Sequence, residues 1–156
     1  VQRAYMDTHE GRLPIQDGID VMTVGGVTFK RYLEIAKILN KETAVVTDND
    51  GNIKAITDKY KEYEGIPFIH ICFDRVVDTG NLKLSDKNFN YNTLEPKILK
   101  ENGREVLNNI FETDYNTDDE MHKYMHAHKI DCAIAIFESA TKIKYPEYIM
   151  RALKNE

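Results

Sequence analysis

The 156-residue chain has little of what marks several classes of protein. It contains only two cysteines, Cys72 and Cys132, each inside an apolar stretch, which excludes a disulfide framework and a cysteine-ligated zinc site. It has no apolar run near the ~18 residues that are needed to cross a bilayer, and no Pro/Gly-rich linker or low-complexity tract. Because two buried thiols fit a reducing compartment, we expect a cytoplasmic protein.

Positive charge is also in deficit, since 21 Lys and Arg face 26 Asp and Glu for a net charge of −5. This balance argues against a protein that coats nucleic acid nonspecifically through a basic surface. It does not argue against an enzyme that contacts phosphodiesters through bound metal ions. The sequence has no G-x-x-x-x-G-K-[ST] motif, so we expect no ATP site in these residues. It also has no complete G-x-G-x-x-G, which leaves dinucleotide binding weakly supported.

The first half of the chain alternates short apolar runs with segments of helical periodicity. We expect strands over 19–24, 43–47 and 68–73, and helices over 1–9, 27–40 and 53–63. The run 43–47 is β-branched and apolar on both faces, which is typical of a central parallel strand. Strands that alternate with helices of this length predict βαβ units, and therefore an α/β fold with a parallel sheet covered by helices.

The pattern changes after residue 73. Residues 74–93 contain few apolar anchors and predict a long irregular connection. After it we expect only helices, over 94–101, 104–111, 118–126, 131–139 and 146–153. Since no domain boundary is evident, we expect one domain over 1–156, with a βαβ core (1–73), a long loop (74–93) and a helical extension (94–156).

The sharpest motif is Asp48-Asn49-Asp50-Gly51, directly after the apolar strand 43–47. Ligands bind at the carboxyl ends of strands in an open parallel sheet, and hard Mg²⁺ prefers carboxylate oxygens, so the motif predicts a divalent-cation site. An Asp-rich turn with a purely structural role is the alternative. An EF-hand loop is excluded, because Gly51 stands fourth instead of sixth and Lys59 occupies the twelfth position.

Three other groups of residues admit a structural or a functional interpretation. The glycine pair 25–26 could let a phosphate approach a helix start, or could simply make a tight turn. Asp74 and Asp78 follow the third strand at the sheet edge expected for the aspartate pair, where they could reach the metal or position DNA. His122 and His126 could share a helix face, but without a suitable third ligand we expect them on a solvated face.

Taken in order, the motifs resemble a known family. Val21–Tyr32 and Val45–Gly51 look like the TOPRIM domain of OLD-family ATP-dependent endonucleases, and they are similar to the nuclease subunit of Gabija-type anti-phage systems. The resemblance continues through Asn90–Pro96, Lys129–Ala133 and Tyr145–Ile149, and so covers nearly the whole chain. It implies a TOPRIM (Rossmann-like) parallel sheet flanked by helices, with a helical C-terminal extension.

The resemblance also implies metal-dependent cleavage of DNA. Asp48 and Asp50 would bind Mg²⁺ or Mn²⁺, Glu95 would join them in a two-metal site, and Lys129 would approach the scissile phosphate. Two cations can activate water and stabilise the leaving oxygen, and a lysine can offset charge that develops on the phosphate. The alternative interpretation makes Glu95 a first-turn helix acid and Lys129 a surface lysine.

Partners are implied in the same way. They are DNA, an ATPase domain upstream in the same full-length protein, and further copies of the full-length chain. The resemblance also implies a role in anti-phage defence, and it implies no membrane partner.

The start of the sequence departs from the family pattern. TOPRIM domains begin with a strand that ends in Glu-Gly, yet no such segment precedes Ile19, and Glu10-Gly11 follows a helix. We therefore expect that the first strand and its glutamate are missing, and that this chain binds metal weakly and cleaves poorly.

Two other functions remain open at this stage. An apolar strand followed by D-x-D-G also resembles the haloacid dehalogenase phosphatases, in which Asp48 would be the nucleophile. Against this, a complete strand–helix unit precedes the motif, and Asn52 follows its glycine where that family has Thr or Val. The third possibility is a noncatalytic TOPRIM-like module for oligomerisation or DNA docking, which would be indifferent to the cation.

Overall fold

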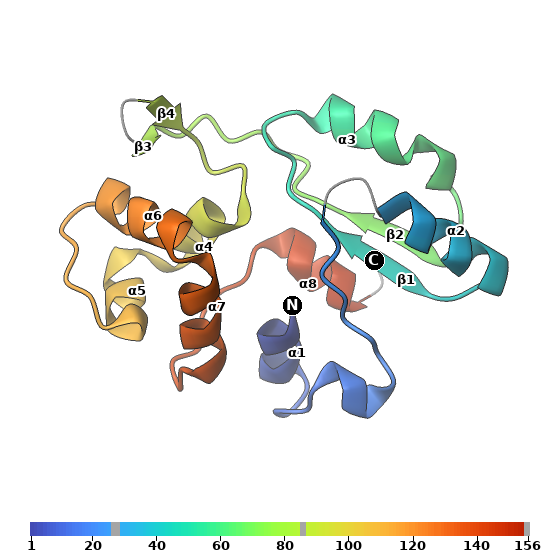
Figure 1. Cartoon of the computed structure of the whole chain (residues 1–156), viewed down its shortest axis with the longest axis horizontal. Helices are drawn as coiled ribbons and strands as arrows, with labels where there is room; N and C mark the ends of the chain where they lie inside the picture. The colour runs from blue at the N-terminus through green and yellow to red at the C-terminus, as the bar shows by residue number, and fades with distance from the viewer. Residues whose placement is uncertain (26–28, 85–86, 155–156) are drawn as a thin grey trace. The chain divides into compact units, whose positions relative to one another are not determined.

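The computed structural model describes residues 1–25, 29–84 and 87–154, and the chain divides into two compact units (Figure 1). Unit 1 consists of Val1–Thr47, Lys54–Phe73 and Glu147–Glu156, and unit 2 of Asp48–Ile53 and Asp74–Pro146. The chain therefore passes from one unit to the other four times.

Unit 1 is built on two parallel strands, β1 (Thr43–Val46) and β2 (Ile69–Cys72), with Thr43 opposite Ile69. Its helical elements are α1 (Gln2–Thr8), the 3₁₀ turn η1 (Pro14–Asp17), α2 (Phe29–Leu39), α3 (Ile53–Tyr60), the 3₁₀ turn η3 (Lys61–Tyr63) and α8 (Glu147–Lys154). Figure 1 shows β1 and β2 as neighbouring arrows accompanied by α2 and α3. The predicted α/β class, with a parallel sheet flanked by helices, is confirmed.

The core of unit 1 forms where the apolar faces of these elements meet. Leu33 and Ala36 lie on one face of α2 and are buried, while the lysines and arginine between the apolar positions remain exposed. The buried cluster consists of Leu33, Val45, Ile56, Tyr60, Tyr63 and Ile69. The Tyr63 hydroxyl donates a hydrogen bond to Glu34 Oε1 (2.8 Å), which satisfies its polar atom inside this cluster.

The last helix, α8, completes unit 1 from the far end of the sequence. It contacts both β1 and β2, and its buried residues are Tyr148, Ile149 and Ala152. Arg151 Nη2 donates a hydrogen bond to the Phe73 carbonyl (2.6 Å), directly after β2. Burial of three apolar side chains at i, i+1 and i+4 explains why the amphipathic segment 147–154 is helical here.

The expectation of a strand over 19–24 is wrong for this structure, in which these residues are irregular. Ile19, Val21 and Met22 are exposed, with Met22 at 60%. A strand needs a neighbour to satisfy its backbone hydrogen bonds, and none of the described residues pairs with this segment. Gly26 of the predicted glycine turn lies outside the described residues.

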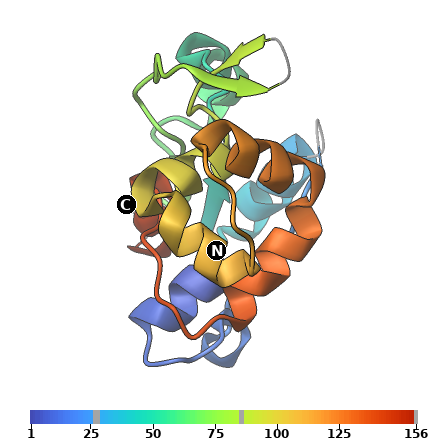
Figure 2. The ribbon, with the colours of Figure 1, turned by 90° about the vertical axis from the view of Figure 1, so that its left-hand side faces the viewer.

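Unit 2 is mainly helical (Figure 2). Its elements are the antiparallel strands β3 (Leu82–Leu84) and β4 (Lys87–Phe89), and the helices α4 (Leu94–Asn102), α5 (Arg104–Phe111), α6 (Asp118–Ala127) and α7 (Lys129–Glu138). The four helices confirm the helical prediction for this region, with α7 beginning at Lys129 instead of residue 131. Gly103, at φ 78° and ψ 155°, makes the sharp connection between α4 and α5, a conformation open mainly to glycine.

The predicted irregular connection over 74–93 is interrupted by the short hairpin of β3 and β4. Leu82 is buried in the core of unit 2, and the backbone N–H of Lys83 donates to Asp119 Oδ1 (2.7 Å) on α6. A three-residue strand with one anchoring side chain carries too little periodicity to be recognised in the sequence. None of the helices over 1–25, 29–84 and 87–154 is long and apolar enough to cross a bilayer.

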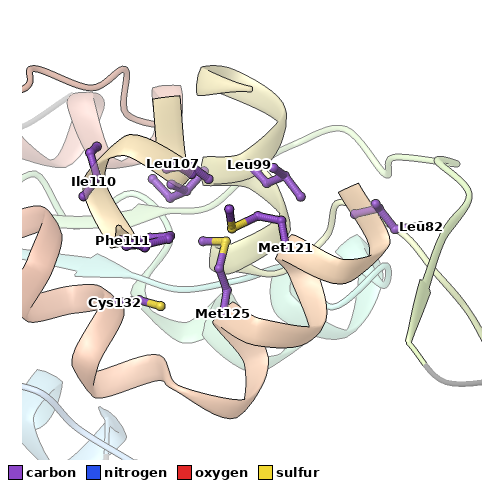
Figure 3. Close-up of a cluster of buried hydrophobic side chains, with 9 residues drawn as sticks. Leu82, Leu99, Leu107, Ile110, Phe111, Met121, Met125 and Cys132 are labelled. Carbon is purple, nitrogen blue, oxygen red and sulfur yellow. The ribbon is translucent and has the colours of Figure 1, made fainter. Parts of the chain in front are cut away.

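The core of unit 2 is a sulfur-rich cluster (Figure 3). Met121 and Met125 project from α6 toward Leu107 and Phe111 of α5, and Cys132 closes one side from α7. The buried members are Leu82, Ile98, Leu99, Leu107, Ile110, Phe111, Met121, Met125 and Cys132. Flexible methionines fill the irregular space where short helices meet. Cys72 and Cys132 are both buried thiols that form no disulfide, as predicted.

Candidate functional site

The D-x-D motif forms a tight turn at the start of unit 2. Asp48 is half-buried and follows Thr47, which ends the first segment of unit 1, whereas Asp50 is exposed. Asp50 and Gly51 both have left-handed backbone (φ 48° and φ 74°). Such a conformation costs a non-glycine residue about 1 kcal/mol or more, so the surroundings must hold the turn in place.

Asn49, between the two aspartates, provides that hold. Its side chain is buried (1% exposed) and donates from Nδ2 to the carbonyls of Asp74 (2.8 Å) and Val76 (3.0 Å). Its Oδ1 accepts from the Gly51 N–H (2.9 Å). All three side-chain hydrogen bonds join the D-x-D turn to itself or to the segment after β2. The carboxylates on either side of Asn49 are therefore carried on a fixed backbone.

A second buried asparagine repeats this arrangement. Asn92 is 1% exposed, accepts from the Asp78 N–H (2.9 Å) and donates to the Asp78 carbonyl (3.0 Å). Its amide also lies against Gly51, because a Cβ on that glycine would meet Asn92 Nδ2 at 3.5 Å. Asn49 and Asn92 thus fix the backbone over 74–78 from two sides.

Lysines of α4 neutralise the two acids that follow β2. Lys97 is buried and forms an ion pair with Asp74, and Lys100 pairs with Asp78 one turn further along the helix. The hydrogen bond from Lys100 lowers the pKa of the Asp78 carboxyl, so this acid is charged and committed to its lysine. Asp74 and Asp78 therefore support the D-x-D turn through α4, and their charges are already compensated.

Glu95 and Lys129 meet across the helices of unit 2. Lys129 Nζ lies 2.8 Å from Glu95 Oε1, which joins the first turn of α4 to the first residue of α7. The Glu95 side chain is 18% exposed and that of Lys129 is 54% exposed. The Glu95 carboxylate therefore holds the Lys129 ammonium group in place while leaving it accessible to solvent. These two residues, far apart in the sequence, were both predicted to belong to the site.

The predicted metal ligands are not gathered into one group. Over the part of the chain that the structure describes, no three His, Cys, Asp or Glu side chains are arranged to hold a metal ion. Asp48 and Asp50 remain a two-carboxylate pair, and Glu95 is engaged with Lys129. A chain of contacts within unit 2 links the D-x-D turn to the helix that carries Glu95. Asn49 donates to the Asp74 carbonyl, and the Asp74 carboxylate pairs with Lys97. Lys97 lies on α4, two residues after Glu95.

His122 is buried against the β3–β4 hairpin instead of lying on a solvated face. It is 1% exposed, its ring centroid is 4.8 Å from that of Phe89, and its Nδ1 is buried without a hydrogen-bond partner. Burial lowers the pKa of its imidazole, and the neighbouring His126 lowers it further. The expectation of a solvated face is wrong for His122 because α6 turns this position toward the hairpin, whereas His126 is exposed.

Sequence reasoning missed the residues that hold the site together. Asn49 lies in the D-x-D motif and Asn92 in the segment 90–96, but the sequence predicted no role for either of them or for Lys97. A buried lysine leaves no trace in the sequence, because lysine is almost always exposed. An asparagine beside a left-handed residue in an aspartate–glycine turn is the one available signal, since its amide can bond the backbone two residues on.

Comparison with known proteins gives one finding. Residues 1–50 match the family model described as "Overcoming lysogenization defect protein-like, TOPRIM domain". No curated protein and no solved structure matches the chain. The matched stretch includes the Asp48–Asp50 pair and stops before Glu95 and Lys129. Over residues 1–50 the chain is thus similar to a class of domain that processes nucleic acid and binds divalent metal ions.

Proposed function

We propose that this chain is the metal-dependent nuclease domain of an OLD-like protein, which hydrolyses phosphodiester bonds in DNA. The observation that carries the proposal is the Asp48–Asp50 pair, held on a turn that Asn49 fixes to the segment after β2. The similarity of residues 1–50 to an OLD-like TOPRIM domain supports the same function, because the similar region includes both aspartates.

The D-x-D turn suits a hard divalent cation. Mg²⁺ is commonly held by one or two carboxylates together with water, and Mn²⁺ accepts the same donors. Asp48 and Asp50 would hold the cation, and Glu95, which is paired with Lys129, would be the third carboxylate available to it. A bound divalent cation supplies Lewis-acid polarisation of the phosphodiester.

Lys129 binds the substrate phosphate. Its half-exposed ammonium group is tethered by Glu95, so it is oriented without being removed from solvent. When charge develops on the phosphate oxygens, this cation offsets it, and the start of α7 adds a second positive influence at the same place. Glu95 therefore acts first by positioning the lysine.

The wider context belongs to the same proposal. The chain carries no P-loop, so ATP hydrolysis is assigned to a separate ATPase domain of the full-length OLD-like protein. Association of full-length copies and a role in defence against phage DNA follow from the resemblance to OLD-family and Gabija-type nucleases.

The first test measures Mn²⁺ binding by electron paramagnetic resonance for the native chain, Asp48→Asn and Asp50→Asn. Each variant should weaken binding by about tenfold or more, because each removes one of two charged ligands. Asp58→Asn is the matched control, since it makes the same charge change at an exposed position on α3. Equal Mn²⁺ affinity in all four proteins would refute the metal site.

The second test follows relaxation of supercoiled plasmid, in which a single nick per molecule is detected. Slow nicking is expected in Mn²⁺, with none in EDTA or with Asp48→Asn. Lys129→Met should slow it about 100-fold without abolishing Mn²⁺ binding. Hydrolysis of a small phosphomonoester through a trapped phospho-Asp48 would favour the phosphatase instead. DNA binding that is indifferent to cation and to Asp48, without nicking, would favour a noncatalytic module.

A further inference from the structure

A hollow of about 330 Å³ lies on unit 2, away from the D-x-D turn in the sequence. Its lining residues are Tyr115 of the α5–α6 connection, Glu120, Lys123, Tyr124 and Ala127 of α6, and His128 between α6 and α7. The volume falls at the small end of the range of about 300–1,000 Å³ that small-molecule sites occupy. The hollow therefore suits one planar group better than an extended ligand.

Three rings form one side of the hollow. The Tyr124 ring centroid lies 5.4 Å from that of Tyr115 and 4.7 Å from that of His128. Phe111 supports Tyr124 from the core at 6.0 Å. Tyr115 and Tyr124 are partly buried and His128 is exposed, so ring surface remains open to a ligand.

The hollow is fixed before any ligand binds. Asn108 holds the Tyr115 backbone at both ends, donating to its carbonyl (2.9 Å) and accepting from its N–H (3.1 Å). At the start of α6, Thr117 Oγ1 accepts from the Glu120 N–H (3.2 Å) and Glu120 Oε2 accepts from the Thr117 N–H (2.9 Å). Because the rings stand on a backbone that is already ordered, little conformational entropy is lost on binding.

The charges around the rings favour a ligand with an anionic tail. Lys123 lines the hollow with an exposed side chain, and Lys129 follows His128 directly. Two acids nearby have partners: Glu120 accepts from the backbone at residues 116 and 117, and Asp131 Oδ2 lies 3.5 Å from His128 Nδ1. An aromatic face flanked by lysines is the combination that binds single-stranded nucleic acid.

We propose that this hollow stacks an unpaired nucleobase of single-stranded DNA on Tyr115 and Tyr124, with the adjoining phosphates held by Lys123 and Lys129. The inference rests on the proposed nuclease function and adds to it a preference for DNA with an unpaired base near the cleavage point. Stacking accepts any of the four bases, so the preference is for strand state and not for sequence.

The test uses two short single-stranded oligonucleotides that differ at one position, 2-aminopurine in one and an abasic site in the other. Stacking quenches 2-aminopurine, and the chain has no tryptophan, so the probe can be excited apart from the protein. The native chain should quench the probe and bind the abasic strand about tenfold more weakly.

Variants separate stacking from folding. Tyr124→Phe should keep the quenching and Tyr115→Leu should lose most of it. Ala127→Leu should also lose it, because it fills the hollow from an exposed helical position and removes no core side chain. Tyr32→Leu, an exposed tyrosine on α2, is the matched control and should behave as the native chain. Thermal unfolding followed by circular dichroism checks that each variant is folded.

The outcomes distinguish this inference from the proposed function. Equal binding of the two strands without quenching, or full quenching in folded Ala127→Leu, would overturn the nucleobase site even if cation-dependent nicking is present. Quenching that depends on Tyr115 and Ala127 would support it, even if the native chain shows neither Asp48-dependent Mn²⁺ binding nor nicking. A chain that binds no single-stranded DNA at low salt would also overturn it.

Discussion

Replacement of Asn49 by alanine should loosen the candidate metal site without touching either carboxylate. The buried amide makes three hydrogen bonds, to the carbonyls of Asp74 and Val76 and from the N–H of Gly51. Alanine removes all three hydrogen bonds, leaves their backbone partners unpaired by Asn49, and takes away the hold on the left-handed Asp50. We therefore expect losses of both stability and metal affinity.

The magnitude follows from those contacts. A hydrogen bond contributes about 1 kcal/mol net, so three amount to about 3 kcal/mol if the carbonyls stay dry, and to about 2 kcal/mol if water reaches them. With a urea m-value of about 2 kcal/mol/M, the unfolding midpoint of Asn49→Ala should fall by about 1–1.5 M. Mn²⁺ affinity should fall by about tenfold, the lower end of the effect of losing a supporting contact.

Urea unfolding followed by far-ultraviolet circular dichroism measures the first effect, and electron paramagnetic resonance with Mn²⁺ measures the second. Asn109→Ala is the matched control, because it makes the same substitution at an exposed position of α5 and should change stability by less than about 0.5 kcal/mol. If Asn49→Ala unfolds at the same urea concentration as Asn109→Ala, the amide does not hold the turn and the reasoning fails.

Three further predictions concern ion pairs and thiols. Asp74→Ala leaves Lys97 buried and unpaired, and should lower the free energy of unfolding by about 3 kcal/mol in urea; a loss below about 1 kcal/mol would contradict a buried pair. The hydrogen bond from Lys100 lowers the pKa of Asp78 below the ordinary 3.8. The contribution of this pair to the free energy of unfolding is therefore complete above pH 3.8 and is lost as the pH falls through the lowered pKa. Acid titrations should show Asp78→Asn with a flatter stability curve there, and an unchanged slope would count against the pairing. Burial raises the pKa of Cys132 to about 11 and Cys72 is 1% exposed, so a thiol reagent at pH 8 should label neither until urea unfolds the chain; prompt labelling of either would show that its unit opens readily.

The sequence could predict elements whose partners are local or whose pattern is long. Strand 43–46 follows from its β-branched run, and α2 from the spacing of Phe29, Leu33 and Ala36. The segment 19–24 has the same apolar character, but apolar residues form a strand only beside another strand, and the described residues offer none. The hairpin of β3 and β4 was missed because Leu82 alone anchors β3 in the core.

The site divides in the same way. The D-x-D motif is visible as a pattern, and the resemblance implies Glu95 and Lys129, which the structure places in contact at 2.8 Å. That contact joins residues on α4 and α7, and no local propensity encodes it. The supports, Asn49 and Lys97, act through burial, which depends on what surrounds a residue and not on its type.

The placement of α8 has a consequence for the order of folding. The helix that covers β1 and β2 follows the whole of segment 74–146, so unit 1 closes a long loop before it is complete. Closing a flexible loop of this length costs on the order of 4 kcal/mol in chain entropy. Most of unit 2 is continuous in the sequence and can form its contacts without waiting for α8. During synthesis, the unit that contains β1 and β2 is therefore completed only after the residues of unit 2 have been made.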